Sequence, residues 1–195
     1  MGSSSINLSL SNIWKNWYKF RQGKKSTKEL ERFTYFLEGN LYQLYIDLNN
    51  WQYKHGGYKK FIVTDNKRRE IRVASIRDRV VHRLLYEYLT EIYDKTFIFD
   101  VWSCRKKKGL LGAIERAQKF LRKYPKSFVW RSDVKKFFDN VNHVTLLKII
   151  SLKISDKQAI WILKEIINSY FVPAATQRER ERESKCGFAK RHSNR

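Results

Sequence analysis

The chain has 195 residues, with 41 lysines and arginines against 19 aspartates and glutamates, so its formal net charge is +22. A hydrophobic content of 42% and an aromatic content of 15% suffice for a packed core, which excludes a disordered basic tail of the histone type. No stretch approaches the ~18 apolar residues of a membrane helix, and the start lacks the regions of a signal peptide. We therefore expect a soluble, cytoplasmic protein without a membrane partner, whose charge favours a polyanion.

Helical periodicity dominates the first 57 residues. Apolar side chains recur at helical spacing between Ile13 and Leu48, which predicts two or three short helices. Ser26 with Glu29 has the form of a capping box that would begin the second helix, and Gly39 is placed to end it. Residues 1–57 are therefore predicted to form an N-terminal helical segment.

The period changes to two from Tyr58 to Val73, with a turn at Thr64-Asp65-Asn66, and this pattern predicts a β-hairpin. The hairpin is crowded with cations: Lys59, Lys60, Lys67, Arg68, Arg69 and Arg72. Lysine on an exposed edge can serve only to prevent aggregation. The charge of the whole chain slightly favours phosphate contact over that alternative.

A long helix is predicted next, from a capping box at Ser75 and Asp78 to about Tyr93. An irregular aromatic stretch then leads into a basic turn at 105–109, which precedes another helix over 110–121. These elements fill the second predicted region, residues 58–126.

The third predicted region, residues 127–172, begins with an apolar strand over 127–130. Two helices follow, over 144–150 and 159–170, and a capping box at Ser155 and Gln158 would begin the second of them. No internal repeat interrupts this order.

Asp133 is the most informative acid, because it directly follows the predicted strand. A carboxylate at the end of a buried strand, in a strongly cationic chain, can hold Mg²⁺ against a phosphate. The same carboxylate can instead cap the next helix by accepting backbone N–H bonds. The spacing alone favours the cap.

The segment Arg131-Ser-Asp-Val-Lys-Lys-Phe-Phe-Asp-Asn-Val-Asn-His143 resembles the first palm motif of bacterial reverse transcriptases related to group II intron enzymes, Asp-Ile-Lys-x-Phe-Phe-Asp-x-Ile-Asp-His. Three more segments resemble that family's fingers motifs in order and spacing: Lys67-x-Arg69-x-Ile71, Arg77-Asp-Arg-Val-Val-His82 and Phe97 to Gly109. With Tyr53-x-His55-Gly56-x-Tyr58 and the preceding helices, the resemblance covers residues 12–170. Several ordered motifs are more specific than one, and they favour a metal ligand over a cap at Asp133.

The resemblance implies an α+β, helix-rich, truncated fold: the fingers, over 58–126, and the first part of the palm of a right-hand polymerase. It implies an RNA-directed DNA polymerase that uses Mg²⁺ and deoxynucleoside triphosphates to extend a DNA or RNA primer on an RNA template. Asp133 would ligate both metal ions of the two-metal mechanism, and the backbone carbonyl of Val134 would ligate one of them.

The resemblance also implies roles at the nucleotide. Lys67 and Arg69 would grip the incoming triphosphate, and Phe138 would exclude a ribose 2′-hydroxyl, although plain core packing stays open for its ring. The residues that would contact template or phosphate are Arg72, Arg105, Lys106, Lys107 and Lys108. For the turn at 105–108, a merely solvated basic loop is an equally good interpretation.

The chain departs from the family after Tyr170. It contains no Gly-x-Pro-x-Gly loop and no Tyr-x-Asp-Asp motif, so we expect it not to polymerise alone. Residues 173–195 carry an Arg/Glu tract without an apolar face, for which a disordered tail, a shifted reading frame, a truncation and a genuine charged linker stay open. The alternative functions are a noncatalytic RNA-binding module and maturase-type binding of an intron RNA.

Overall fold

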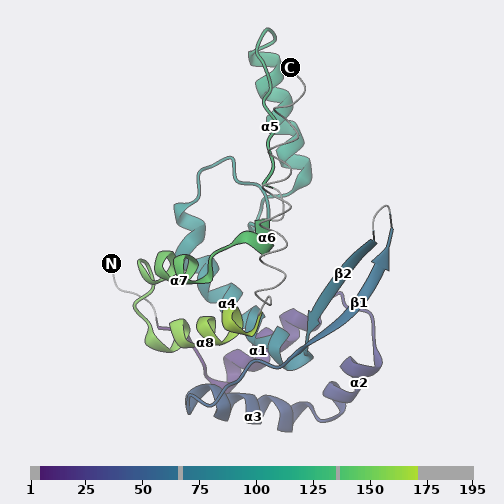
Figure 1. The fold of residues 1–195 in the computed structure, drawn as a ribbon, viewed down its shortest axis with the longest axis vertical. Helices are drawn as coiled ribbons and strands as arrows, with labels where there is room; N and C mark the ends of the chain where they lie inside the picture. Colours follow the sequence, from purple (N-terminus) through teal and green to yellow (C-terminus); the bar gives the residue numbers. More distant parts are fainter. Residues whose placement is uncertain (1–4, 66–67, 135–136, 171–195) are drawn as a thin grey trace, which may run out of the picture.

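The computed structural model describes residues 5–65, 68–134 and 137–170, except for the side chains of Phe138 and Asp139. This part of the chain is helix-rich, with one two-stranded antiparallel sheet, so the α+β class is confirmed. A body of packed helices carries two arms, the hairpin of β1 (Tyr58–Thr64) and β2 (Arg68–Ala74) and the helix α5 (Leu110–Lys123) (Figure 1). None of the helices described is both long and apolar enough to cross a membrane.

The remaining elements follow the predicted order closely. They are α1 (Leu10–Arg21), α2 (Lys28–Tyr35), α3 (Leu37–Asn49), α4 (Ile76–Tyr93), the 3-10 turn η1 (Asp94–Thr96), α6 (Phe137–Asn140), α7 (His143–Ser151) and α8 (Lys157–Ser169). The three N-terminal helices, the hairpin and the long helix are confirmed. At the start of α4 the Ser75 hydroxyl accepts the backbone N–H of Asp78, as the capping pattern predicts.

The boundary between α2 and α3 differs from the prediction. Thr27, not Ser26, caps α2, because its hydroxyl accepts the backbone N–H of Leu30. Gly39 lies inside α3, and the break falls at Phe36. The side-chain amide of Asn40 donates to a carbonyl near the end of α2, that of Phe33, at 3.0 Å, and this bond supports the helix end where it occurs.

The cap of α8 is Asp156 rather than Ser155. One Asp156 carboxylate oxygen accepts the backbone N–H groups of Gln158 and Ala159, and the other accepts the backbone N–H of Ile6 at 2.8 Å. The two oxygens of a carboxylate offer about four acceptor sites, enough for all three N–H groups, whereas a hydroxyl offers two. The contact with the N-terminal segment therefore determines which residue caps the helix.

A single hydrophobic core joins the N-terminal helices to α4 and α8. Its fully enclosed side chains include Ile13, Leu41, Leu44, Leu48, Val80, Val81 and Ile162. Helix α8 is also tied to this body by a 2.8 Å hydrogen bond from Gln158 to the carbonyl of Leu48 and by the rings of Trp51 and Trp161, 5.1 Å apart. The core thus unites residues from all three predicted regions, whose limits stay a prediction.

The predicted strand at 127–130 is wrong. This segment runs back from the far end of α5 toward α6 without regular structure (Figure 1), and Phe128 and Trp130 are 102% and 90% exposed. A strand requires a neighbour that satisfies its backbone groups. Among the residues described, β1 and β2 pair with each other and no strand pairs with this segment.

Candidate nucleic-acid interface

The two faces of the hairpin differ in character. In the antiparallel register, Lys59↔Val73, Phe61↔Ile71 and Val63↔Arg69 share one face, and Lys60↔Arg72, Ile62↔Glu70 and Thr64↔Arg68 share the other. The first face therefore carries an apolar strip between two cations, and Phe61 is 49% exposed there. The second face is mainly charged.

The cations of the hairpin differ in their partners. Lys59 is 2.6 Å from Glu29 of α2, and Arg72 is 2.9 Å from Glu70. The hydrogen bond from Arg72 is the largest cause of a lowered pKa at Glu70. Arg68 and Arg69, at the outer end, are exposed and form no ion pair with any acid that the structure describes. The outer end of the hairpin is consequently an unbalanced positive surface; Lys67 lies outside the described residues.

The root of the hairpin is anchored on three sides through Tyr58. Its hydroxyl is 3.0 Å from the hydroxyl of Ser169 in α8. Its ring stacks on His55, with 5.1 Å between ring centres, and lies nearly perpendicular to the ring of Tyr170, with 5.9 Å between centres. The guanidinium of Arg72 lies over the same Tyr170 ring at 5.2 Å. Arg72, predicted to contact template or phosphate, therefore also supports the root.

A buried carboxylate fixes the segment that leads into the root. Asp78 is 1% exposed and accepts the Tyr53 hydroxyl at 2.9 Å, the Gly56 backbone N–H at 3.2 Å and the Ser75 hydroxyl at 2.6 Å. Burial, followed by the charge of Asp78, raises the pKa of Tyr53. A Cβ on Gly56 would lie only 2.9 Å from Asp78 Oδ2, so glycine permits this approach. Sequence reasoning assigned Asp78 to a helix cap and missed the two partners more than twenty residues upstream.

The basic turn at 105–108 is largely occupied by internal contacts. The Arg105 guanidinium donates to both carboxylate oxygens of Asp94, at 2.7 and 3.3 Å, and to the carbonyl of Ile98 at 3.1 Å. Lys106 is 3.5 Å from Glu87, and Lys108 donates to the carbonyl of Phe99. Lys107, with a left-handed φ of 60°, forms no ion pair with an acid among the residues described. Of the four predicted contact residues in this turn, Lys107 is therefore the one most available to a ligand.

We expect Arg105→Ala to affect mainly the stability of the fold and Lys107→Ala to affect mainly the binding of RNA. The first removes the guanidinium that joins Asp94 to the 97–105 segment, so it should lower the melting temperature. The second should leave the melting temperature unchanged and weaken RNA binding slightly, because one phosphate contact is lost. Calorimetry and fluorescence anisotropy measure the two effects. Equal melting temperatures for the two variants would contradict this assignment.

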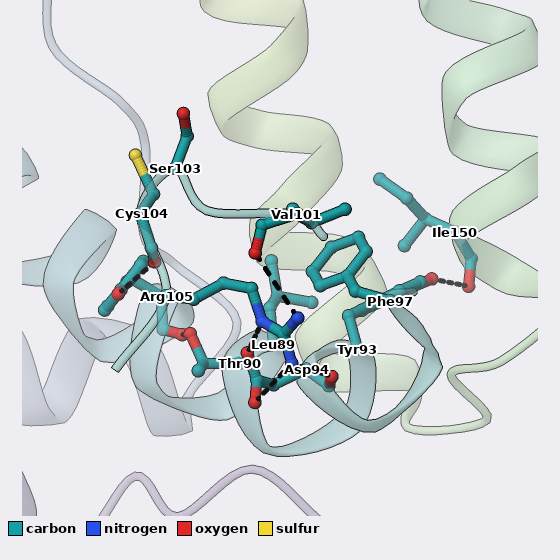
Figure 2. A pocket seen from close by; sticks show the side chains of 11 residues that line it. Leu89, Thr90, Tyr93, Asp94, Phe97, Val101, Ser103, Cys104, Arg105 and Ile150 are labelled. Atoms are coloured by element: carbon teal, nitrogen blue, oxygen red, sulfur yellow. Dashed lines mark hydrogen bonds and ion pairs between the residues drawn. The ribbon is translucent and has the colours of Figure 1, made fainter. Parts of the chain in front are cut away.

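A pocket of about 410 Å³ lies where the end of α4 meets the 97–105 segment and α7. Its walls are mainly apolar, with Leu89, Phe97, Val101 and Ile150 around the space and the Arg105–Asp94 pair beside it (Figure 2). Asp94 is the one carboxylate among the described residues that line it. The pocket can accommodate an apolar group, but its lining offers no set of ligands for Mg²⁺.

Asp133, predicted to bind metal, is exposed. Its carboxylate accepts the backbone N–H of the adjacent Val134 at 3.0 Å. In the ranges 5–65, 68–134 and 137–170, no group of three His, Cys, Asp or Glu residues is placed to hold a metal ion. Phe138 belongs to α6, but its side chain lies outside the described residues, as do residues 173–195.

Searches of the sequence against protein-family models and against curated proteins find no match.

Proposed function

We propose that this chain forms the fingers and the first part of the palm of an RNA-directed DNA polymerase that acts with Mg²⁺, deoxynucleoside triphosphates and a primed RNA template. The observation that carries the proposal is the outer half of the hairpin. There Arg68 and Arg69 are exposed without an acidic partner among the described residues, beside the apolar strip formed by Phe61, Val63 and Ile71. Together with the ordered sequence motifs, this surface favours a polymerase that binds nucleic acid and nucleotide.

The chemistry of the hairpin suits a nucleotide. A guanidinium offers a planar fork of N–H donors that matches two phosphate oxygens. The apolar strip shares a face with Arg69, so a phosphate bound there would leave a base or sugar next to Phe61 and Ile71. The rigid root at Tyr58 holds this surface away from the helical body (Figure 1).

A noncatalytic RNA-binding module is the second candidate. It is favoured by the same exposed arginines of the hairpin, which suffice for RNA binding without any chemistry at Asp133. Both candidates require phosphate binding, and they differ in whether Asp133 carries chemistry. Maturase-type binding of an intron RNA is a variant of this candidate and uses the same basic surface.

RNA binding tests the element that both candidates share. The affinity for single-stranded RNA should fall steeply with salt, with a log–log slope of several units, because bound phosphates release counterions. The double variant Arg68→Ala/Arg69→Ala should reduce that slope by about 2, roughly one unit for each phosphate contact. Fluorescence anisotropy across a series of salt concentrations gives both values.

The matched control is Lys148→Ala/Lys157→Ala, which removes two exposed cations from α7 and α8. It makes the same change in net charge, but away from the hairpin, so the wild-type slope should be largely retained. Equal slopes for the two double variants would show that the hairpin is not the binding surface. A flat salt dependence of the wild-type chain would reject both candidates.

A further inference from the structure

Two imidazoles meet beside the root of the hairpin. Nε2 of His55, in the segment between α3 and β1, is 3.1 Å from Nε2 of His82 in α4. The ring centres are 5.2 Å apart and the ring planes 15° from parallel. Since the two nitrogens are much closer than the ring centres, the rings face each other edge to edge. This geometry is that of an N–H···N hydrogen bond.

The protons of this pair can be assigned from its surroundings. Nδ1 of His55 lies 2.6 Å from the carbonyl of Gly56, and a carbonyl only accepts, so this nitrogen carries a proton. In the neutral pair, Nε2 of His55 is then the acceptor and Nε2 of His82 is the donor. One additional proton can be accommodated by exchanging these roles. A second additional proton would place two N–H groups opposite each other and abolish the bond.

The pair connects α4 to the start of the hairpin. The His55 ring is stacked on Tyr58, the first residue of β1, and Tyr58 is the residue that anchors the root to α8. His82 belongs to the helix that follows β2 directly. The orientation of the hairpin on the helical body is therefore linked to the hydrogen bond between the two imidazoles.

Burial and the charge of His55 lower the pKa of His82 from its usual 6.5. Among the neighbours on α4, Asp78 raises this pKa and Arg79 lowers it. From outside α4, the ring of Tyr58 in β1 stacks on His55, and the Gly56 carbonyl faces Nδ1 of His55. The pKa of His82 is thus lower in the folded chain than in the unfolded chain. The stability that the neutral pair contributes is therefore present above about pH 6.5 and is lost as the pH falls through the folded-state pKa.

We propose that His55 and His82 are positioning residues of the hairpin: their shared hydrogen bond sets its orientation, and a second added proton releases the root and weakens phosphate binding by Arg68 and Arg69. The part that concerns phosphate rests on the proposed function. Release of the root should weaken RNA binding on acidification, whereas extra positive charge on a protein generally strengthens nonspecific RNA binding. A loss of affinity on acidification is therefore informative.

The variant His82→Gln distinguishes the positioning role of the hydrogen bond from the titration of the imidazole. Its side-chain amide can donate to or accept from Nε2 of His55 and does not titrate, so His82→Gln should hold the root at both pH values. His55→Gln provides the same substitution on the other member of the pair, since both histidines are half-buried. His143→Gln, in α7, is the matched control and should behave as the wild type.

The test uses the full chain at constant ionic strength, at pH 7.5 and pH 5.0. In the wild type, amide exchange of β1 and β2, corrected for its intrinsic pH dependence, should accelerate about fivefold at the lower pH, the effect of losing one hydrogen bond. Binding of a single-stranded RNA should weaken in parallel. Both glutamine variants at positions 55 and 82 should lose these pH effects, whereas the His143 variant should keep them.

Each outcome decides the proposal. Unchanged hairpin exchange in the wild type, or a wild-type pH profile in both His55→Gln and His82→Gln, would overturn it. If His82→Gln fails to fold, the test rests on His55→Gln and on an NMR titration of the wild-type imidazoles. Two imidazoles that titrate independently, each with a single midpoint at the ordinary pKa of histidine, would also overturn the proposal. Acid-sensitive exchange without RNA binding at either pH would support the positioning role and reject the proposed function.

Discussion

Replacing Asp78 by alanine should lower the free energy of unfolding by about 3–5 kcal/mol, the range for breaking a buried, hydrogen-bonded charge. The substitution removes the acceptor of Tyr53, Gly56 and Ser75 together. Tyr53 is fully buried, so its hydroxyl would lose its partner without access to water. Chemical denaturation of the purified chain measures the change.

Asp100→Ala is the matched control for this experiment. Like Asp78, Asp100 is a hydrogen-bond acceptor: it accepts two hydrogen bonds from the guanidinium of Arg116, at 2.9 and 3.2 Å. That ion pair is exposed, and solvent screens it. Its loss should hardly change the unfolding midpoint. Similar losses of stability in the two variants would show that the buried hydrogen bonds of Asp78 do not stabilise the root more than an exposed ion pair does.

Asp133→Ala should abolish template-dependent DNA synthesis in a chimera in which the palm and thumb of a group II intron-type reverse transcriptase follow Tyr170. In that setting the Tyr-x-Asp-Asp carboxylates would complete a two-metal site, and Asp133 would bridge both ions. We expect a loss of at least about a thousandfold, because electrostatic stabilisation of the transferring phosphoryl group depends on both ions. Primer extension on an RNA template measures it.

The fold should survive this substitution. Asp133 is exposed, and its carboxylate forms one local hydrogen bond, with Val134, so the melting temperature should not change. Glu91→Ala, which removes another exposed acid, should retain full synthesis. Substantial synthesis by Asp133→Ala would exclude it as a metal ligand, and an inactive chimera that still binds RNA would favour the noncatalytic module.

The elements that could be predicted from the sequence have local signals. The second strand of the hairpin alternates polar and apolar residues from Glu70 to Val73. Helix α4 begins at Ser75, whose hydroxyl accepts the backbone N–H of Asp78, the third residue of the helix. The cation-rich outer end of the hairpin was evident for the same reason, because the charges are contiguous in the sequence. The acids that neutralise some of these cations come from other elements, as Glu29 does for Lys59.

The remainder depended on distant partners. The cap of α8 was displaced to Asp156 by a contact with Ile6, 150 residues away. The His55–His82 pair spans 27 residues, and no periodic pattern connects the two positions. The strand before Asp133 failed for the opposite reason: its apolar residues suit a sheet, but the described part of the chain contains no strand that pairs with it.

The exposed segment Phe128–Trp130 has a consequence for how this protein behaves in solution. Its three consecutive bulky apolar residues form no backbone hydrogen bond within the described part of the chain, so another chain can add a strand there. At low ionic strength, mutual repulsion between molecules of charge +22 opposes such encounters. Above ~0.1 M salt the Debye length shrinks below about 10 Å, and that colloidal protection weakens. Under the proposed function, the salt that would release bound RNA is the same salt that permits self-association, so the free protein would aggregate most readily under the conditions in which RNA dissociates.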